Sequence, residues 1–260
     1  MRVALCQIEV GDEPQANLAA VRKALAEAGD ADLAVFPEAA MARFGNRLPE
    51  IAEPLDGPFV TGLRQAAREH GTALVAGVFE PAPDGRVFNT AVAIDASGEP
   101  AGSYRKIHLF DAFAFAESRS VAPGCDPVVV ELGGVRLGLI TCYDIRFPEL
   151  ARALVDRGAD VLVVTAAWYQ GVFKEEHWTT LVRARAIENT IWTIAVDKAP
   201  DRDDPPRGQR TGVGRSLLVD PMGTVTADLG PFPAVRALDL DLELTAEVRR
   251  TLPSLEHRRL

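Results

Sequence analysis

Short apolar segments rich in β-branched residues alternate along this chain with longer amphipathic segments. Near the N-terminus, apolar segments at 2–8 and 31–36 flank a segment at 14–29 whose apolar residues recur with the period of a helix. Further along, the apolar segments 159–167 and 190–197 flank a second helix-like segment. This alternation predicts an α/β fold, in which helices connect the strands of a sheet and cover it.

Three hairpins interrupt the alternation and add antiparallel strands. Residues 88–105 form the first, and residues 127–142 form the second around Gly133 and Gly134, a pair that tolerates the positive φ angles of a tight turn. Residues 216–229 contain an Asp-Pro-Met-Gly sequence suited to a third turn. We therefore expect mixed sheets covered by helices on their outer faces, a layered α/β sandwich and not a purely doubly wound fold.

The composition excludes several classes of partner. The 260 residues are 47% hydrophobic and 25% charged, and no linker or repeat divides them, so we predict one domain over residues 1–260. The net charge of −9, with 28 scattered Lys and Arg residues, argues against binding to nucleic acid. No apolar run approaches the roughly 18 residues of a membrane span, and the first apolar segment is too short for a signal peptide. We expect a cytosolic protein with no membrane partner.

The cysteines and histidines do not form a recognisable metal motif. The three cysteines have no CxxC spacing, and the four histidines never occur at i, i+4, so neither a disulfide framework nor a zinc site is indicated. We predict no metal and no cofactor. Cys6 alternates within a strand and is interpreted as a packing residue, whereas Cys125 lies in a Pro-Gly-Cys-Asp-Pro turn and is interpreted as incidental.

Cys142 has a different local context. It ends the apolar run GVRLGLIT and precedes YDIRFPEL, in which Pro148 suits the first turn of a helix. A thiol at such a strand-to-helix elbow can face a cleft, and the backbone N–H of Tyr143 is then free to bind an oxygen beside the sulfur. The alternative is that Cys142 only packs against the core, as free cysteines commonly do.

Two charged residues also follow predicted strands. Glu38 comes after ADLAVFP, and a partly buried carboxylate there would have a raised pKa suited to a general base. Lys106 follows a strand in SYRKIHLFD and opens a segment of weak periodicity at 106–126, long enough to suggest an active-site loop. Taken singly, each residue is more commonly a solvated surface charge.

Together these contexts resemble a known family. A strand followed by FPE, then YRKIHLF, then a strand ending in CYDIRFPEL, in that order, is similar to the nitrilase (carbon-nitrogen hydrolase) superfamily. HWTTLVRARAIEN, TGVGRSLLVDPMG and the tail LPSLEHRRL resemble later parts of the same family, and CYDIRFPEL is closest to its Nit branch, which includes omega-amidase and deaminated-glutathione amidase. The resemblance implies a four-layer αββα sandwich and a homodimer or higher homo-oligomer.

The resemblance also implies a mechanism. Cys142 would be the nucleophile, Glu38 the base and Lys106 the third member of a catalytic triad that cleaves a small amide, in particular an omega-amide of a carboxylic acid, through a thioester with release of ammonia. A second acid of the family matches Glu117, which would orient Lys106. The alternatives are hydrolysis of an N-carbamoyl compound or a nitrile, or a catalytically silent binding protein that keeps the fold.

The substrate-binding residues are expected near the nucleophile and in the later loop. We predict contacts from Arg146, Trp168, Tyr169 and Phe173, and the guanidinium of Arg146 could bind a substrate carboxylate or simply stabilise the start of a helix. The loop WYQGVF is bulkier than the corresponding loop of the Nit branch, which argues against the shortest dicarboxylic monoamides. For the dimer, the helices at 147–158 and 175–189 offer apolar contact candidates, some of which must face the chain's own sheet, namely Leu150, Leu154, Trp178, Leu181 and Val182.

Overall fold

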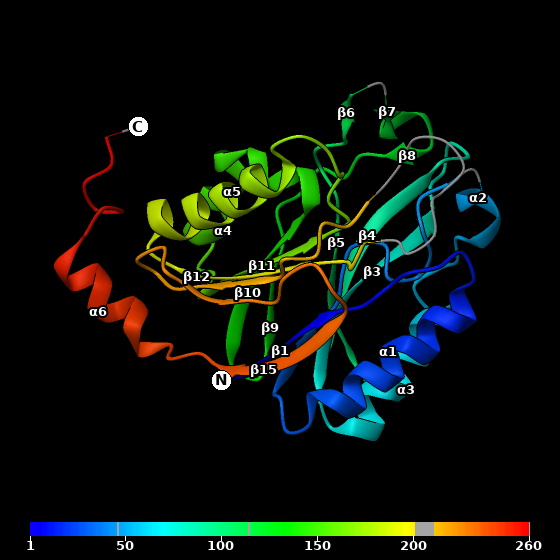
Figure 1. The fold of residues 1–260 in the computed structure, drawn as a ribbon, viewed down its shortest axis with the longest axis horizontal. Helices are drawn as coiled ribbons and strands as arrows, with labels where there is room; N and C mark the ends of the chain where they lie inside the picture. The colour runs from blue at the N-terminus through cyan, green and yellow to red at the C-terminus, as the bar shows by residue number, and fades with distance from the viewer. Residues whose placement is uncertain (46, 114, 201–210, 260) are drawn as a thin grey trace.

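The computed structural model describes residues 1–45, 47–113, 115–200 and 211–259. Two mixed β-sheets lie face to face at the centre of the molecule (Figure 1). The first sheet has the strand order β15-β1-β2-β3-β4-β5, with β8 paired to β4. Its strands are β1 (Arg2–Gln7), β2 (Leu33–Val35), β3 (Ala73–Pro81), β4 (Val87–Ile94), β5 (Pro100–Arg105), β8 (Val121–Ala122) and β15 (Ala234–Asp239).

The second sheet has the order β14-β13-β12-β11-β10-β9, and a small separate hairpin pairs β6 with β7. The strands of the second sheet are β9 (Val129–Leu132), β10 (Val135–Thr141), β11 (Val161–Ala166), β12 (Trp192–Asp197), β13 (Leu217–Val219) and β14 (Val225–Asp228). The small hairpin consists of β6 (Asp111–Ala112) and β7 (Phe115–Ala116).

Helices cover both outer faces of the paired sheets. In Figure 1, α1 (Pro14–Ala28) and α3 (Pro58–His70) lie beside the first sheet, while α4 (Pro148–Asp156) and α5 (Lys174–Asn189) lie on the opposite side, beside the second. The four layers confirm the predicted αββα sandwich. The remaining helices are α2 (Leu48–Ile51) and α6 (Glu243–Thr251), and α6 projects to one side of the layers with the C-terminal residues (Figure 1). Among the described residues, none of the helices has the length and apolarity needed to cross a bilayer.

The alternation of side chains along β1 explains how the layers are held together. Val3 and Leu5 belong to a core cluster that also contains residues of the second sheet, whereas Ala4 and Cys6 pack with residues of α1 and α3. This is the two-residue period of a strand buried on both faces. Cys6 is fully buried, so its interpretation as a packing residue is confirmed.

Local sequence signals account for several element boundaries. Pro14, Pro58 and Pro148 each stand in the first turn of their helix, where the missing N–H costs nothing. Gly133 and Gly134 have φ angles of 58° and 77° between β9 and β10, as the predicted tight hairpin requires.

The predicted contact residues of a dimer have a different role in the structure. Leu150, Leu154, Trp178 and Val182 are buried within the chain's own core, and only Leu181 is partly exposed. The first four are therefore the candidates that face the chain's own sheet, and of the five only Leu181 stays available for a contact with a second subunit.

Candidate active site

Cys142 occupies a strained turn directly after β10. It is the first residue of the 3₁₀ helix η2 (Cys142–Arg146), and its φ of 49° lies in the left-handed region that a residue with a Cβ adopts at a cost of roughly 1–3 kcal/mol. Asp144 holds the turn closed by accepting a hydrogen bond from the Thr141 N–H at 3.1 Å. The Tyr143 N–H stands in the first turn of η2, where backbone N–H groups have no partner within the helix.

Glu38 is held in place by the close packing of its backbone and by hydrogen bonds from three other segments. The Glu38 backbone lies so close to β3 that a Cβ at Gly77 would stand 2.7 Å from the Glu38 Cα, which explains a glycine in that strand. Glu38 Oε1 accepts hydrogen bonds from Lys106 Nζ (3.0 Å) and Asn89 Nδ2 (2.7 Å). Oε2 accepts one from the Ala167 N–H at 2.8 Å.

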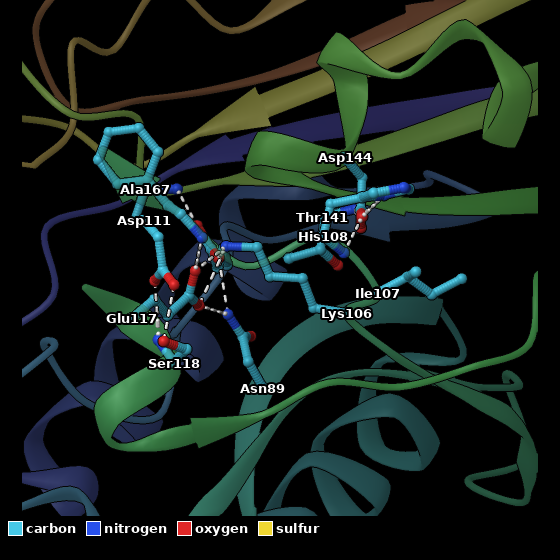
Figure 2. Close-up of polar contacts among 12 residues, drawn as sticks. Asn89, Lys106, Ile107, His108, Asp111, Glu117, Ser118, Thr141, Asp144 and Ala167 are labelled. Carbon is cyan, nitrogen blue, oxygen red and sulfur yellow. Dashed lines mark hydrogen bonds and ion pairs between the residues drawn. The ribbon is translucent and has the colours of Figure 1, made fainter. Parts of the chain in front are cut away.

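Lys106 is buried between two carboxylates. Its Nζ lies 2.8 and 3.1 Å from the two oxygens of Glu117, in addition to its contact with Glu38. Figure 2 shows Lys106 extending towards Glu117 and Asn89, with Ala167 on the far side of the cluster. Glu117 begins the short 3₁₀ helix η1 (Glu117–Arg119) and is fixed in turn by the Phe110 N–H at 2.7 Å.

The electrostatics of this cluster keep both Lys106 and Cys142 protonated. Burial alone would lower the pKa of Lys106, but the charges of Glu117 and Glu38 outweigh it and raise that pKa well above 10.5. The pKa of the Cys142 thiol is raised well above 9.0 by burial and then by the charge of Glu38, with Lys106 opposing. A thiol with a raised pKa needs a base to become a thiolate.

Asp144 joins the nucleophile turn to the segment that carries Lys106. Besides Thr141, its carboxylate accepts hydrogen bonds from the Tyr104 hydroxyl (2.7 Å) and the His108 N–H (2.9 Å), and it lies 2.8 Å from His108 Nδ1. Figure 2 shows His108, Thr141 and Asp144 as a cluster separate from the one around Glu117. Tyr104 and His108 flank Lys106 in sequence, so Asp144 fixes the position of the lysine relative to Cys142.

A cavity opens over these groups. Glu38, Lys106, Glu117 and Cys142 all line it, as does Tyr143. The rest of the lining is largely aromatic and includes Phe44, Phe110, Phe115, Trp168 and Tyr169. A cavity with this lining suits a small molecule that carries both apolar and polar groups.

The predicted substrate-binding residues divide into two groups. Trp168 and Tyr169 line the cavity, but Arg146 and Phe173 do not. The Arg146 guanidinium lies outside, 5.2 Å from the Trp168 ring, with one nitrogen 3.3 Å from His177 Nδ1. Phe173 points into solvent with 73% of its surface exposed.

Sequence reasoning missed three polar residues near the cavity. Asn89 is a polar residue within the buried strand β4, and that unusual position was its only signal. Asp197 ends β12 and accepts hydrogen bonds from the N–H groups of Trp168 (2.7 Å) and Val213 (2.6 Å), and burial raises its pKa well above 3.8. Lys174 lines the cavity, although a lysine in the first turn of a helix normally indicates a solvated charge.

Within the described residues, no group of three or more His, Cys, Asp or Glu side chains is arranged to hold a metal ion. The groups that line the cavity include a thiol, two carboxylates and two lysines. A thiol beside a carboxylate and a buried cation is an arrangement suited to acyl transfer through a thioester.

Comparison with known proteins agrees with this chemistry. Residues 2–250 match the sequence profile described as carbon-nitrogen hydrolase. The chain is 45% identical to a protein of Mycobacterium tuberculosis named only as a hydrolase, over 99% of this chain and 95% of the relative. It is 36% identical to the deaminated glutathione amidase of Escherichia coli O157:H7, over 95% and 92% of the two chains. The crystal structure of Nit3 of Saccharomyces cerevisiae, from branch 10 of the nitrilase superfamily, superposes with a TM-score of 0.88 at 26% identity, covering 100% of this chain and 97% of Nit3.

Proposed function

The chain belongs to the carbon-nitrogen hydrolase family, and we propose that it is a thiol amidohydrolase that cleaves a small amide, in particular an omega-amide of a carboxylic acid, and releases ammonia. One observation carries the proposal: Glu38 contacts Lys106 beside Cys142, and all three line one aromatic cavity. Relatives named as amidases support the choice of an amide over other carbon-nitrogen bonds. The proposal includes a single domain over residues 1–260 and a cytosolic location.

The first half of the reaction would form a thioester. Glu38 takes the proton of the Cys142 thiol while the sulfur attacks the amide carbonyl carbon. The negative charge that develops on the carbonyl oxygen is bound by Lys106 Nζ and the Tyr143 N–H, and each such donor can contribute about 3–4 kcal/mol to the transition state. Glu38 then gives its proton to the leaving nitrogen, the carbon-nitrogen bond breaks, and ammonia departs.

The second half would release the acid. Water attacks the thioester carbon while Glu38 accepts one of its protons, and the oxyanion is again bound by Lys106 and Tyr143. Collapse of this intermediate breaks the carbon-sulfur bond, and the proton on Glu38 returns to the sulfur of Cys142. Glu117 does not take part in these transfers, but it holds Lys106 in its protonated form and in place throughout.

The test is ammonia release from a panel of free amides, N-carbamoyl compounds and nitriles, with cysteine variants as controls. Cys142→Ala should abolish turnover of every substrate, whereas Cys6→Ser and Cys125→Ser should retain it, since neither residue lines the cavity. Activity should fall in proportion to the fraction of Cys142 that iodoacetamide has alkylated. Normal turnover by Cys142→Ala would overturn the mechanism, and a panel in which only N-carbamoyl compounds or nitriles react would overturn the amide substrate.

A further inference from the structure

Lys174 is a buried cation in the wall of the cavity that the proposed chemistry leaves without a role. It is the first residue of α5, and only 3% of its surface is exposed. Its Nζ lies 4.1 Å from the ring centre of Phe113 and 5.1 Å from that of Phe110. The rings of Trp168 and Tyr169 complete this aromatic cage at 5.7 and 5.8 Å.

A hydrogen bond and cation–π attraction hold Lys174 within this aromatic cage. Trp168 Nε1 donates a hydrogen bond to the Lys174 carbonyl oxygen at 2.8 Å, which fixes the start of α5 against the cavity wall. The rings attract the ammonium group through their π faces, an interaction worth roughly 0.5–2 kcal/mol. This attraction positions the ammonium group, but a ring does not neutralise its charge.

No carboxylate of the described residues forms an ion pair with Lys174, in contrast with Lys106, which contacts two. Glu175, the next residue on α5, is paired instead with Arg215 at 3.6 Å. Burial lowers the pKa of Lys174, the like charge of Arg146 lowers it further, and a thiolate at Cys142 would oppose this shift. Buried lysines are normally paired, so a cation in this setting is suited to an anion brought by the ligand.

We propose that Lys174 binds the carboxylate of the substrate, at the end opposite the amide that Cys142 attacks, and that it makes the enzyme selective for omega-amides of carboxylic acids. The inference rests on the proposed amidase function. The two lysines of the cavity then have separate tasks: Lys106 faces the reacting carbonyl oxygen, and Lys174 faces the distant carboxylate. The aromatic rings between them cover the apolar carbons of the substrate.

This assignment replaces Arg146, which the sequence suggested for the same task. Arg146 does not line the cavity, and its guanidinium is already placed beside the Trp168 ring and His177. Trp168 both lines the cavity and contacts Arg146 and Lys174, so the arginine supports the aromatic cage from outside. Its positive charge also strengthens the attraction of the cage for an anion.

The experiment compares acids with neutral amides of matched length. Ammonia release is measured from the monoamides of glutaric and adipic acid and from valeramide and hexanamide, which carry a methyl group in place of the carboxylate. Lys174→Met should raise KM and lower kcat/KM for the acids by roughly 10- to 100-fold, the range expected for a charge-assisted hydrogen bond, and leave the neutral amides unchanged. Lys174→Arg should retain part of the preference for the acids.

Lys23→Met is the matched control, because Lys23 is an exposed lysine of α1 with 80% of its side chain in solvent. It should leave the kinetics of both substrate classes unchanged. An equal loss for acids and neutral amides in Lys174→Met, or a wild-type enzyme with no preference for the acids, would overturn the assignment.

The failure of the proposed function would look different, since the wild-type protein would then release ammonia from no amide. Binding of glutarate, measured by calorimetry, would still test Lys174 in that case. Wild-type protein should bind glutarate and Lys174→Met should bind it at least roughly 10-fold more weakly. Equal binding by the two proteins would overturn the role of Lys174 in holding a carboxylate.

Discussion

At the scale of single residues, the proposed chemistry depends on the fixed orientation of the Glu38 carboxylate. Both of its oxygens accept hydrogen bonds, from Lys106 and Asn89 on one side and from the Ala167 N–H on the other. These donors stabilise the carboxylate and fix its orientation towards the thiol. The residue can therefore receive a proton from Cys142 without first having to move.

Glu38→Gln tests this role. The amide keeps the size of the side chain but cannot accept the thiol proton. Both carboxylate oxygens of Glu38 accept hydrogen bonds, so the NH₂ group of glutamine would face a donor in either of its two orientations. We expect kcat to fall by at least roughly 10²- to 10⁴-fold, the range of general acid-base groups. Glu80→Gln is the control, because Glu80 is also buried and paired, with Arg105 and Thr90, but does not line the cavity. Comparable losses in the two variants would assign the base elsewhere.

Lys106→Met tests the oxyanion role at the same scale. The interaction of Lys106 strengthens only as negative charge develops on the carbonyl oxygen, so kcat should fall far more than substrate affinity. Lys106→Arg should not restore the rate, because a planar guanidinium does not fit a site built around a point charge. Steady-state kinetics separate the outcomes, and a change confined to KM would make Lys106 a substrate-binding residue.

The same substitution also removes a cation from between two buried carboxylates, which costs about 3–5 kcal/mol when a buried pair is broken. Thermal unfolding of Lys106→Met therefore has to be measured beside its kinetics. If the variant stays folded at the assay temperature, its loss of kcat reports the role of Lys106 in catalysis and not a loss of folded protein.

At the scale of elements, the site exists because several strands end at one edge of the sandwich. Strands β1, β2 and β3 pair in parallel, and so do β10, β11 and β12. The carboxyl ends of parallel strands meet at one edge, which is where α/β sheets bind ligands. Glu38, Cys142 and Ala167 follow three of these strands, and the hydrogen bond from Ala167 to Glu38 joins the two sheets there.

Asp144→Asn tests the connection between β10 and the segment after β5. The amide has one acceptor oxygen where the carboxylate now meets Thr141, Tyr104 and His108, so at least one buried donor loses its partner. We expect the free energy of unfolding to fall by about 1–3 kcal/mol. We also expect kcat to fall, because Lys106 is no longer held against Cys142.

Urea unfolding and kinetics measure the two effects. Asp111→Asn is the control, since Asp111 pairs with Ser118 at an exposed part of the same loop and should change either quantity only slightly. Unchanged stability and rate in Asp144→Asn would show that the loop is positioned by other contacts.

At the scale of the whole molecule, the outer surfaces of α4 and α5 remain the expected place for a second subunit. The faces that contact the second sheet are excluded, because Leu150, Leu154, Trp178 and Val182 are buried there. A two-fold contact would have to use the remaining faces, which present residues such as Arg183 and Ile187. The projecting α6 offers further surface beyond the layers (Figure 1).

We expect light scattering to give at least twice the 28.0 kDa mass of one chain, with activity that falls on dissociation. The physical reason is that η2 precedes α4 directly, so a contact on α4 would also support the turn of Cys142. A fully active sample with the mass of one chain would contradict the dimer. The exposed faces of α4 and α5 would then be ordinary protein surface.

The sequence by itself determined the fold class and the three residues of the proposed triad. The periods of apolar residues, the prolines at helix starts and the two glycines of the hairpin act over a few neighbouring residues, so they can be read from the chain directly. The elbow at Cys142 is also local, because it depends on the end of one strand and the start of the next helix. The combination of Glu38, Lys106 and Cys142 needed the resemblance to a family, since each residue alone is more commonly a packing residue or a surface charge.

Only the tertiary structure decided what surrounds these residues. Glu38 meets Asn89 from 51 residues away and the Ala167 N–H from 129 residues away, and no local pattern encodes such contacts. The same holds for Phe173 and Lys174, which are adjacent but lie outside and inside the cavity. Phe173 precedes α5 with a left-handed backbone (φ 59°), whereas Lys174 is the first residue of the helix, so the turn into α5 and the packing of that helix against the second sheet decide which of the two faces the cavity.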